Sequence, residues 1–287
     1  MRIRRVNLPQ ATYAKPEQVD QFWRAIQQKV NSLPGVQSAS LASGLPPERP
    51  INANDTYIEG FAAVPNGPGH NIDYWQIVGD RYFETMGIRV IEGRGLDARD
   101  GAGVALTAVI NRTMARVYYG DQSPIGRRIN PEGGPNRPET YRTIVGVAED
   151  VKNAALDKPA GTEVFFPGLQ RDFAGRTIYI VVRGAGDPKA LFSAVRAAVR
   201  ELDSSLPLTQ VRTMDEVLAS AKSRPRLLTT LLGLFSATAL VLAAVGLFGV
   251  ISTPSLAGRR SSASAWQWGP AAATCSDWLS ARVCASR

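Results

Sequence analysis

An uncharged run at residues 227–252 constrains the fold of this chain more than any other feature. More than half of its residues are Leu, Ile, Val or Phe, and none is charged. At ~1.5 Å per helical residue the run would extend roughly 39 Å, which exceeds the ~30 Å hydrocarbon core of a bilayer. A soluble protein would have to cover every face of so apolar a helix. We therefore predict a membrane-spanning helix over residues 227–252.

Positive charge is concentrated around this run. The chain has 287 residues and a formal net charge of +8, with Lys222, Arg224 and Arg226 before the run and Arg259 and Arg260 after it. Cations beside an apolar span are typical of contact with lipid headgroups. The residues before the run lack the basic and aromatic stripe of a single-strand binder. We expect membrane lipid as a partner and no nucleic acid. Because cations flank both ends, their count does not set the orientation of the span.

Residues that commonly bind metals or nucleotides are scarce. Cys275 and Cys284 both follow the run, in a spacing unlike that of a zinc-binding pair, and His70 is the only histidine. The glycine pairs at 93–95 and 101–103 lack the Lys-Ser/Thr that completes a P-loop. We therefore expect no metal site and no bound cofactor, ATP included.

Four carboxylates are the candidate acid–base or metal-binding groups: Asp97, Asp100, Glu149 and Asp150. Their spacing matches no calcium-binding loop, and no histidine or serine partner of recognisable order accompanies them. The sequence also lacks a G-x-S-x-G nucleophile motif. We interpret these carboxylates as solvated surface groups. The sequence thus predicts no catalytic, cofactor-binding or metal-binding residues, and we do not expect an enzyme.

A strand–helix–strand unit occurs twice in the chain. In the first copy an N-terminal strand precedes a helix that begins at Pro16, and a strand follows at 36–42. In the second a strand at 177–183 precedes a helix that begins at Pro188, and a strand follows at 208–211. Two such halves commonly share one sheet with the helices on one face, the split βαβ arrangement of an α+β fold. The three-four spacing expected of the buried helix faces is met by Val19, Phe22, Trp23, Ile26 and Val30, and by Leu191, Phe192, Val195, Val199 and Leu202.

The long middle of the chain, residues 46–172, then has to be an insertion between the two copies. Its entry is rich in Pro and Gly and is predicted to be a loop. We predict strands at 74–78, 104–110, 143–147 and 163–166 and short helices at 80–86 and 112–118, which together make a second α+β unit. A separate short helix at 213–220 is expected before the basic residues 222–226.

Several stretches together resemble the periplasmic core domain of MacB/FtsX-like ABC transporter permeases. The resemblance covers about residues 1–253. Its last two stretches look like the start of the second transmembrane helix of such a permease. The stretches are 33–39 (LPGVQSA), 82–88 (YFETMGI), 109–115 (VINRTMA), 123–127 (SPIGR), 144–147 (IVGV), 211–217 (VRTMDEV), 232–235 (LGLF) and 243–246 (AAVG).

The resemblance implies a domain organisation and a role. Residues 1–45 and 173–224 would be the halves of a porter-like subdomain, residues 46–172 an inserted subdomain, and residues 254–287 an irregular tail. The soluble part would lie outside the inner membrane and transmit ATP-driven motion in export or envelope processes. The implied partners are a cytoplasmic ABC ATPase and other permease helices or a second permease copy, and the permease itself is not an ATPase.

The sequence departs from the family pattern at both ends. Members normally have a transmembrane helix before the core domain, whereas this chain opens on a predicted strand without a secretory signal. After the span, members have a cytoplasmic loop and further helices. Here residues 262–269 (SASAWQWG) are compatible with that loop's motif read in a shifted frame. We therefore expect a permease truncated at both ends, with a frameshifted tail, that does not transport alone.

Two other classes of function stay open. The first is a membrane-tethered binding or scaffold module that holds an envelope partner. The second is a tethered hydrolase, but the sequence shows no recognisable set of nucleophile and base that would support it.

Overall fold

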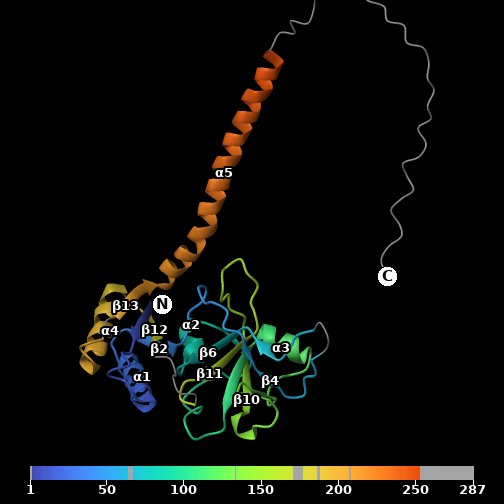
Figure 1. Ribbon diagram of the computed structural model, residues 1–287. Helices are drawn as coiled ribbons and strands as arrows, with labels where there is room; N and C mark the ends of the chain where they lie inside the picture. Colours follow the sequence, from blue (N-terminus) through green and yellow to red (C-terminus); the bar gives the residue numbers. More distant parts are fainter. Residues whose placement is uncertain are drawn as a thin grey trace, which may run out of the picture. The chain divides into compact units, whose positions relative to one another are not determined.

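One long mixed sheet organises the chain, and helices pack against it (Figure 1). The computed structural model describes residues 2–63, 67–132, 134–170, 177–185, 188–206 and 208–252. The mixed α+β content confirms the predicted fold class. The tail predicted at 254–287, with both cysteines, lies outside the described residues.

In chain order the elements are β1 (Arg2–Asn7), α1 (Pro16–Asn31), β2 (Val36–Ala42), β3 (Asn54–Asp55), β4 (Tyr57–Ile58), β5 (Asn71–Ile72), β6 (Tyr74–Val78), α2 (Tyr82–Met86), β7 (Val90–Gly93), β8 (Thr107–Asn111), α3 (Arg112–Tyr119), β9 (Arg128–Asn130), the 3₁₀ turn η1 (Pro138–Thr140), β10 (Arg142–Ala148), β11 (Glu163–Pro167), β12 (Thr177–Gly184), α4 (Pro188–Leu202), β13 (Leu208–Thr213) and α5 (Met214–Ser252).

The two predicted repeats interleave at one end of the sheet. The strand order there is β13-β1-β12-β2, and every neighbouring pair is antiparallel. The two strands of each strand–helix–strand unit are therefore parallel and are separated by one strand of the other unit. This is the split βαβ arrangement predicted from the repeat.

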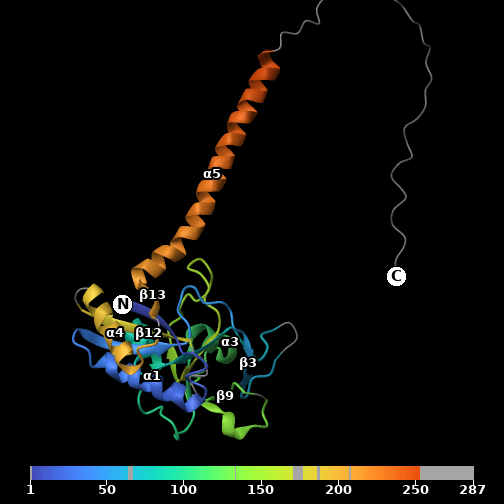
Figure 2. The same ribbon diagram turned by 60° about the vertical axis from the view of Figure 1, so that its left-hand side comes forward.

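Helices α1 and α4 cover one face of these four strands (Figures 1 and 2). Trp23, Ile26 and Val30 of α1 are fully buried against strand residues and against α4. At ~1.5–3 kcal/mol for each large apolar side chain, this burial is the main stabilising contribution of the helix. Tyr13 Oη also donates to Asp203 Oδ2 at 2.8 Å, which links the approach to α1 with the end of α4.

The middle of the chain extends the same sheet. Beyond β2 the order continues β6-β11-β8-β10-β9-β4, and β7 pairs with β10. The predicted strands at 74–78, 104–110, 143–147 and 163–166 appear as β6, β8, β10 and β11. The sequence did not predict that the sheet is continuous. A single residue pair of the sheet, Ala42↔Val78, joins β2 to β6.

Buried residues form three clusters along this sheet. One lies under α1 and α4, and a second, which includes Met114 and Phe166, lies under α3. The third lies where β2 meets β6 and contains Tyr82 and Phe83 of α2 together with Ala42 and Val181 of the repeat strands. Helix α2 therefore covers the junction between the repeat strands and the middle strands.

Helix α5 is continuous from Met214 to Ser252. The expectation of a separate short helix at 213–220 was wrong, since the helix runs through the basic residues 222–226 without a break. Pro225 removes one helical hydrogen bond, but the flanking Leu, Lys, Arg and Ala residues are strong helix formers and continue the helix. Residues Thr230–Gly249 have a mean hydropathy of 2.3 and are 0% buried, and by length and composition this helix is able to cross a membrane.

Candidate functional site

Residues 43–52, the crossing segment, carry the chain from the end of β2 to the middle strands. The segment is fastened to β6 by backbone and side-chain bonds. Ser43 N donates to Ile77 O at 3.0 Å, and Ile77 N donates back to Ser43 Oγ at 3.0 Å. The buried side chain of Gln76 donates to Gly44 O at 2.8 Å. The start of the segment therefore follows any displacement of β6.

A buried ion pair fixes the middle of the crossing segment. Arg49 is 6% exposed and its Nη1 donates to Oε1 of Glu163, which is 1% exposed and opens β11. Nη1 also donates to Asn153 Oδ1 at 3.1 Å, and Nη2 donates to Trp75 O at 2.9 Å. A Cβ on Gly44 would lie 2.7 Å from Arg49 Nε, so only glycine leaves room for this side chain.

The environment of Glu163 opposes its charge. Burial raises the pKa of Glu163 above its ordinary value, although Arg49 and a 2.7 Å hydrogen bond from Asn153 Nδ2 act in the opposite direction. A buried carboxylate that lost its arginine would have no comparable compensation. The pair therefore favours this one placement of the crossing segment over others.

The same network continues to the N-terminus of α3. Glu163 N donates to Asn111 Oδ1 at 3.0 Å, and the same oxygen caps the helix by accepting from Met114 N at 2.9 Å. Asn111 Nδ2 donates to Asp150 Oδ1 at 2.8 Å, and Thr113 Oγ1 donates to Asp150 Oδ2 at 2.9 Å. Hydrogen bonds thus connect the crossing segment with α3 across β11 and β8.

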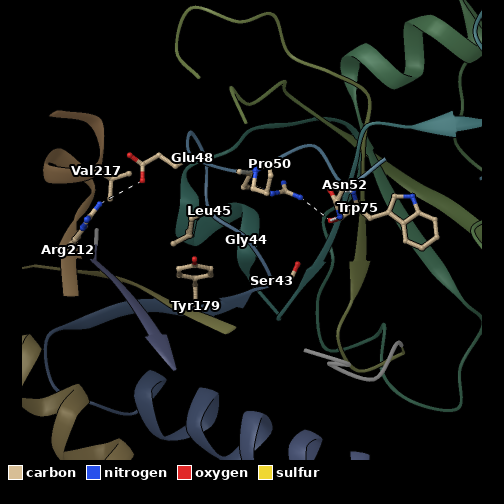
Figure 3. Close-up of a pocket in the computed structure, with 11 residues that line it drawn as sticks. Ser43, Gly44, Leu45, Glu48, Pro50, Asn52, Trp75, Tyr179, Arg212 and Val217 are labelled. Carbon is tan, nitrogen blue, oxygen red and sulfur yellow. Dashed lines mark hydrogen bonds and ion pairs between the residues drawn. The ribbon is translucent and has the colours of Figure 1, made fainter. Parts of the chain in front are cut away.

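A cavity of about 330 Å³ adjoins the crossing segment (Figure 3). It lies where the crossing segment faces β12, the end of β13 and the first turn of α5. At its edge Arg212 Nη1 of β13 lies 3.8 Å from Glu48 Oε2. The lining residues are Ser43, Gly44, Leu45, Glu48, Arg49, Pro50, Asn52, Trp75, Tyr179, Arg212 and Val217.

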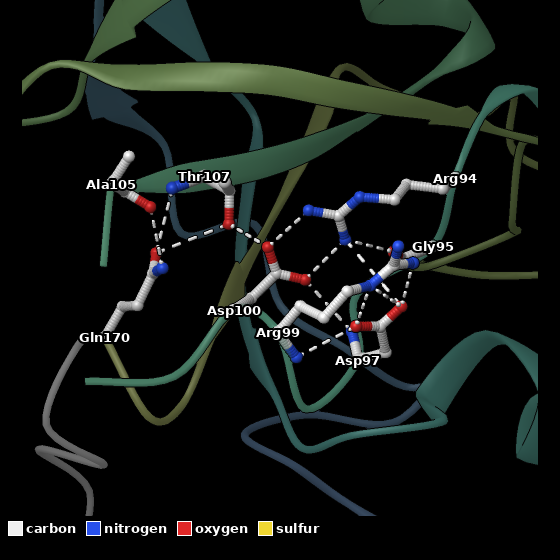
Figure 4. A network of polar contacts seen from close by, with 8 residues as sticks. All are labelled: Arg94, Gly95, Asp97, Arg99, Asp100, Ala105, Thr107 and Gln170. Atoms are coloured by element: carbon white, nitrogen blue, oxygen red, sulfur yellow. Dashed lines mark hydrogen bonds and ion pairs between the residues drawn. The ribbon is translucent and has the colours of Figure 1, made fainter. Parts of the chain in front are cut away.

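A second polar cluster surrounds Asp100 (Figure 4). Arg94 binds Asp100 through both ends of its guanidinium, at 2.7 and 2.8 Å, and Thr107 Oγ1 donates to Asp100 Oδ1 at 2.8 Å. Asp97 N donates to Asp100 Oδ2 at 3.0 Å. Gln170 extends the cluster by accepting from Thr107 N at 2.8 Å. The cluster holds the loop after β7 against the start of β8.

The candidate carboxylates differ in their surroundings. The interpretation as solvated surface groups was wrong for Asp100, which is 1% exposed. Asp97 is partly exposed and pairs with Arg99, and Arg99 lowers the pKa of Asp97 to about 2. Glu149 and Asp150 lie at the end of β10, in the network of α3. Glu149 is partly exposed and pairs with Arg89 and Arg112.

Burial and hydrogen bonding act in opposite directions on Asp100. Burial raises its pKa, but hydrogen bonds from Arg94, from Asp97 N and from Thr107 outweigh burial and leave the pKa below its ordinary value. The ionised carboxylate is therefore the form that the fold stabilises.

Sequence reasoning missed the residues at the centre of the crossing network, Arg49, Asn153 and Glu163. A signal for Glu163 was present, because it opens the otherwise apolar strand EVFFP. A charge in such a strand needs a buried partner, but nothing in the pattern identifies Arg49 as that partner. Among the described residues no three His, Cys, Asp or Glu side chains gather as a metal site would require. The absence of catalytic and cofactor sites stays a prediction.

Comparison with known proteins points to one family. The family described as "MacB-like periplasmic core domain" matches residues 10–201, a range that includes the middle strands and all of the two repeats except their outer strands β1 and β13. No curated protein matched the sequence.

Solved structures with a similar fold include the periplasmic region of MacB from Actinobacillus actinomycetemcomitans, with a TM-score of 0.50 and 10% identity over 77% of this chain and 92% of that one. The extracellular domain of the noncanonic ABC-type transporter YknZ from Gram-positive bacteria has a TM-score of 0.46 and 13% identity over 73% and 100% of the two chains. A domain of a putative permease protein from Porphyromonas gingivalis has a TM-score of 0.43 and 17% identity over 72% and 87%.

The buried ion pair is tested by a double-mutant cycle on the full chain in detergent micelles. Arg49→Met or Glu163→Met alone is expected to lower the free energy of unfolding by about 3–5 kcal/mol, because each leaves one charge buried without its partner. The double variant is expected to lose at least ~2 kcal/mol less than the sum of the two. Urea unfolding followed by tryptophan fluorescence measures the three values, and additive losses would contradict the coupling.

The Asp100 cluster predicts a pH-dependent loss of stability. Because the folded pKa of Asp100 is lowered, its contribution is present above the unfolded pKa of ~3.9 and is lost as pH falls through the folded pKa. Asp100→Asn is expected to cost about 1.5–3 kcal/mol at pH 7, and the difference from wild type should shrink below pH ~4. Urea unfolding from pH 7 to 3 measures this, with the exposed Asp55→Asn as the control. A difference that did not change with pH would rule out the ionised form as the source.

Proposed function

The chain belongs to the family of MacB-like periplasmic core domains, and from that premise we propose that it is the extracytoplasmic core of an ABC-type transporter permease subunit. In this role the chain transmits motion driven by a cytoplasmic ABC ATPase to a substrate or partner in the cell envelope. The chain itself does not hydrolyse ATP. We further propose that residues 1–45 and 173–224 form one subdomain and residues 46–172 a second. The two large clusters of buried residues support this division.

The direct junction between β13 and α5 carries the proposal. Strand β13 ends at Thr213 and α5 begins at Met214, so no loop separates the sheet from the helix. Thr213 N donates to Glu216 Oε2 at 2.8 Å, and Glu216 N donates to Thr213 Oγ1 at 3.2 Å, which is a capping box. Val217 is buried one turn further on. A displacement of the start of α5 therefore reaches the sheet without being absorbed by a flexible linker.

Contacts from this junction to the middle strands support a relay. Arg212 lies beside Thr213 and faces Glu48 of the crossing segment at 3.8 Å. The next residue, Arg49, enters the buried network that ends at the cap of α3. We propose that motion of α5 reaches α3 along these contacts, which form a contiguous physical path.

The apolar part of α5 supports a membrane attachment. Its 20 residues Thr230–Gly249 match the length of about 20 that a bilayer core requires. We propose a single crossing of the inner membrane by the described part of this chain, with the sheet on the outer side. Helices of other permease subunits are then the neighbours of α5 in the membrane.

A membrane-tethered scaffold is the second candidate. The same span and the same rigid junction would hold an envelope partner at a fixed position without any ATPase. An ATP-binding partner is expected for the permease subunit and not for the scaffold, so its presence or absence distinguishes the two functions.

Labelling with a membrane-impermeant thiol reagent tests the orientation. The cysteines of the chain are both in the tail, so Cys275→Ser/Cys284→Ser leaves a cysteine-free background, into which Ala102→Cys places an exposed thiol. We expect this variant to react in spheroplasts before lysis, because the sheet lies outside. The wild-type chain should react only after lysis, since the span separates its tail from the sheet. The reverse pattern would show that the sheet is cytoplasmic.

Photolabelling with 8-azido-ATP tests the partner. The full chain, purified in mild detergent from its own host membrane, is expected to bring with it a subunit that the reagent labels and that excess ATP protects. The chain itself should stay unlabelled. A preparation without a labelled subunit would favour the tethered scaffold, and labelling of the chain would contradict its proposed lack of ATP hydrolysis.

A further inference from the structure

Three largely apolar side chains line one part of the cavity beside the crossing segment. Leu45, Tyr179 and Val217 come from the crossing segment, β12 and α5, and all three face the same space (Figure 3). The Tyr179 hydroxyl points toward Leu45 and makes no bond to the other residues drawn there. At about 330 Å³ the cavity lies at the lower end of the range for small-molecule sites. Its size suits a ligand of one or two rings.

The two arginines at the cavity, Arg49 and Arg212, differ in how strongly other protein groups bind them. Arg49 is held by Glu163, Asn153 and a backbone carbonyl, so its charge is already balanced inside the protein. Arg212 instead faces Glu48 at 3.8 Å, which is longer than a hydrogen bond, and both side chains are half-exposed. Such an exposed pair is worth little. A ligand anion that met the planar guanidinium with two hydrogen bonds would therefore displace Glu48 readily.

We propose that this cavity binds a small amphipathic anion, with a carboxylate or sulfonate on Arg212 and an apolar body between Leu45, Tyr179 and Val217. The ligand takes the place of Glu48 at Arg212, and Glu48 turns toward solvent on the exposed part of the crossing segment. Its body contacts α5, β12 and the crossing segment together. Binding needs neither an ATPase nor transport, so its test is independent of the proposed function.

The sign of the ligand charge follows from the two rim residues. A zwitterion would use Glu48 for its cationic end, and removal of that carboxylate would weaken binding. For an anion Glu48 is a competitor, and its removal strengthens binding. The two cases predict opposite effects of Glu48→Gln.

Photocrosslinking with 4-benzoylbenzoate tests the site on the full chain in nanodiscs of uncharged lipid. The crosslinked peptides, identified by mass spectrometry, are expected to contain Leu45, Tyr179 or Val217. Arg212→Gln should reduce this labelling about tenfold, because the charged hydrogen bonds are lost. Glu48→Gln should raise it several-fold. The uncharged 4-benzoylbenzamide should label the cavity about tenfold less than the acid.

Two further variants keep the outcome interpretable. Arg196→Gln removes an arginine that lies over Phe192 on α4 and should leave the labelling unchanged. Arg212→Lys keeps the positive charge but loses the planar guanidinium with its two parallel hydrogen-bond donors, so it should retain part of the labelling. This result would separate ligand recognition from misfolding. Labelling spread over the surface, or unaffected by Arg212→Gln, would overturn the site. A decrease with Glu48→Gln would overturn the anionic assignment.

Discussion

The pairing of β1 with β12 is the constraint on which the rest of the structure depends. Six residues of β1 align with six of β12, from Arg2↔Val182 to Asn7↔Thr177, although the paired residues are 170 to 180 positions apart in sequence. Strand β12 also pairs with β2, and Tyr179 lies opposite Ala42. The middle of the chain therefore leaves and returns at neighbouring points of one sheet. Loop-closure entropy grows slowly with length, so an insertion with such ends is tolerated even when it is long.

A second constraint acts where the insertion leaves. One residue pair of the sheet, Ala42↔Val78, joins β2 to β6, and backbone hydrogen bonds from Ser43 N to Ile77 O and from Gly79 N to Leu41 O flank it. Two sets of side chains further restrict the angle between these strands. Helix α2 packs Tyr82 and Phe83 over the junction, and the crossing segment places Arg49 beside Glu163. The apolar contact contributes most of the stability, while the ion pair adds directionality, because any other placement would leave two charges buried without partners.

The repeat strands and helices could be predicted from the sequence because their patterns are long. Helix α1 begins at Pro16 and β2 spans Val36–Ala42, both as the apolar spacing and the stop signals indicate. Strands β3, β4 and β5 were missed, since two residues cannot show a period. The close approach at Gly146, where a Cβ would lie 1.9 Å from Arg94 O, is equally invisible without coordinates. Local patterns specify elements, whereas the crossing network depends on residues more than 100 positions apart, such as Arg49 and Glu163.

The packing around α5 determines where motion can be accommodated. Close-packed regions transmit displacement with little compression, and the strands under α1 and α4 and those under α3 are of this kind. The cavity beside Tyr179 is the loosely packed part of the junction, and it separates the start of α5 from the crossing segment. A movement of Val217 relative to Leu45 would change the volume of this cavity before it strained either hydrophobic core. The pair Arg212–Glu48 spans the same gap and is weak enough to lengthen without a large loss of energy. The gap is therefore the compliant part of the proposed path between the start of α5 and the middle strands.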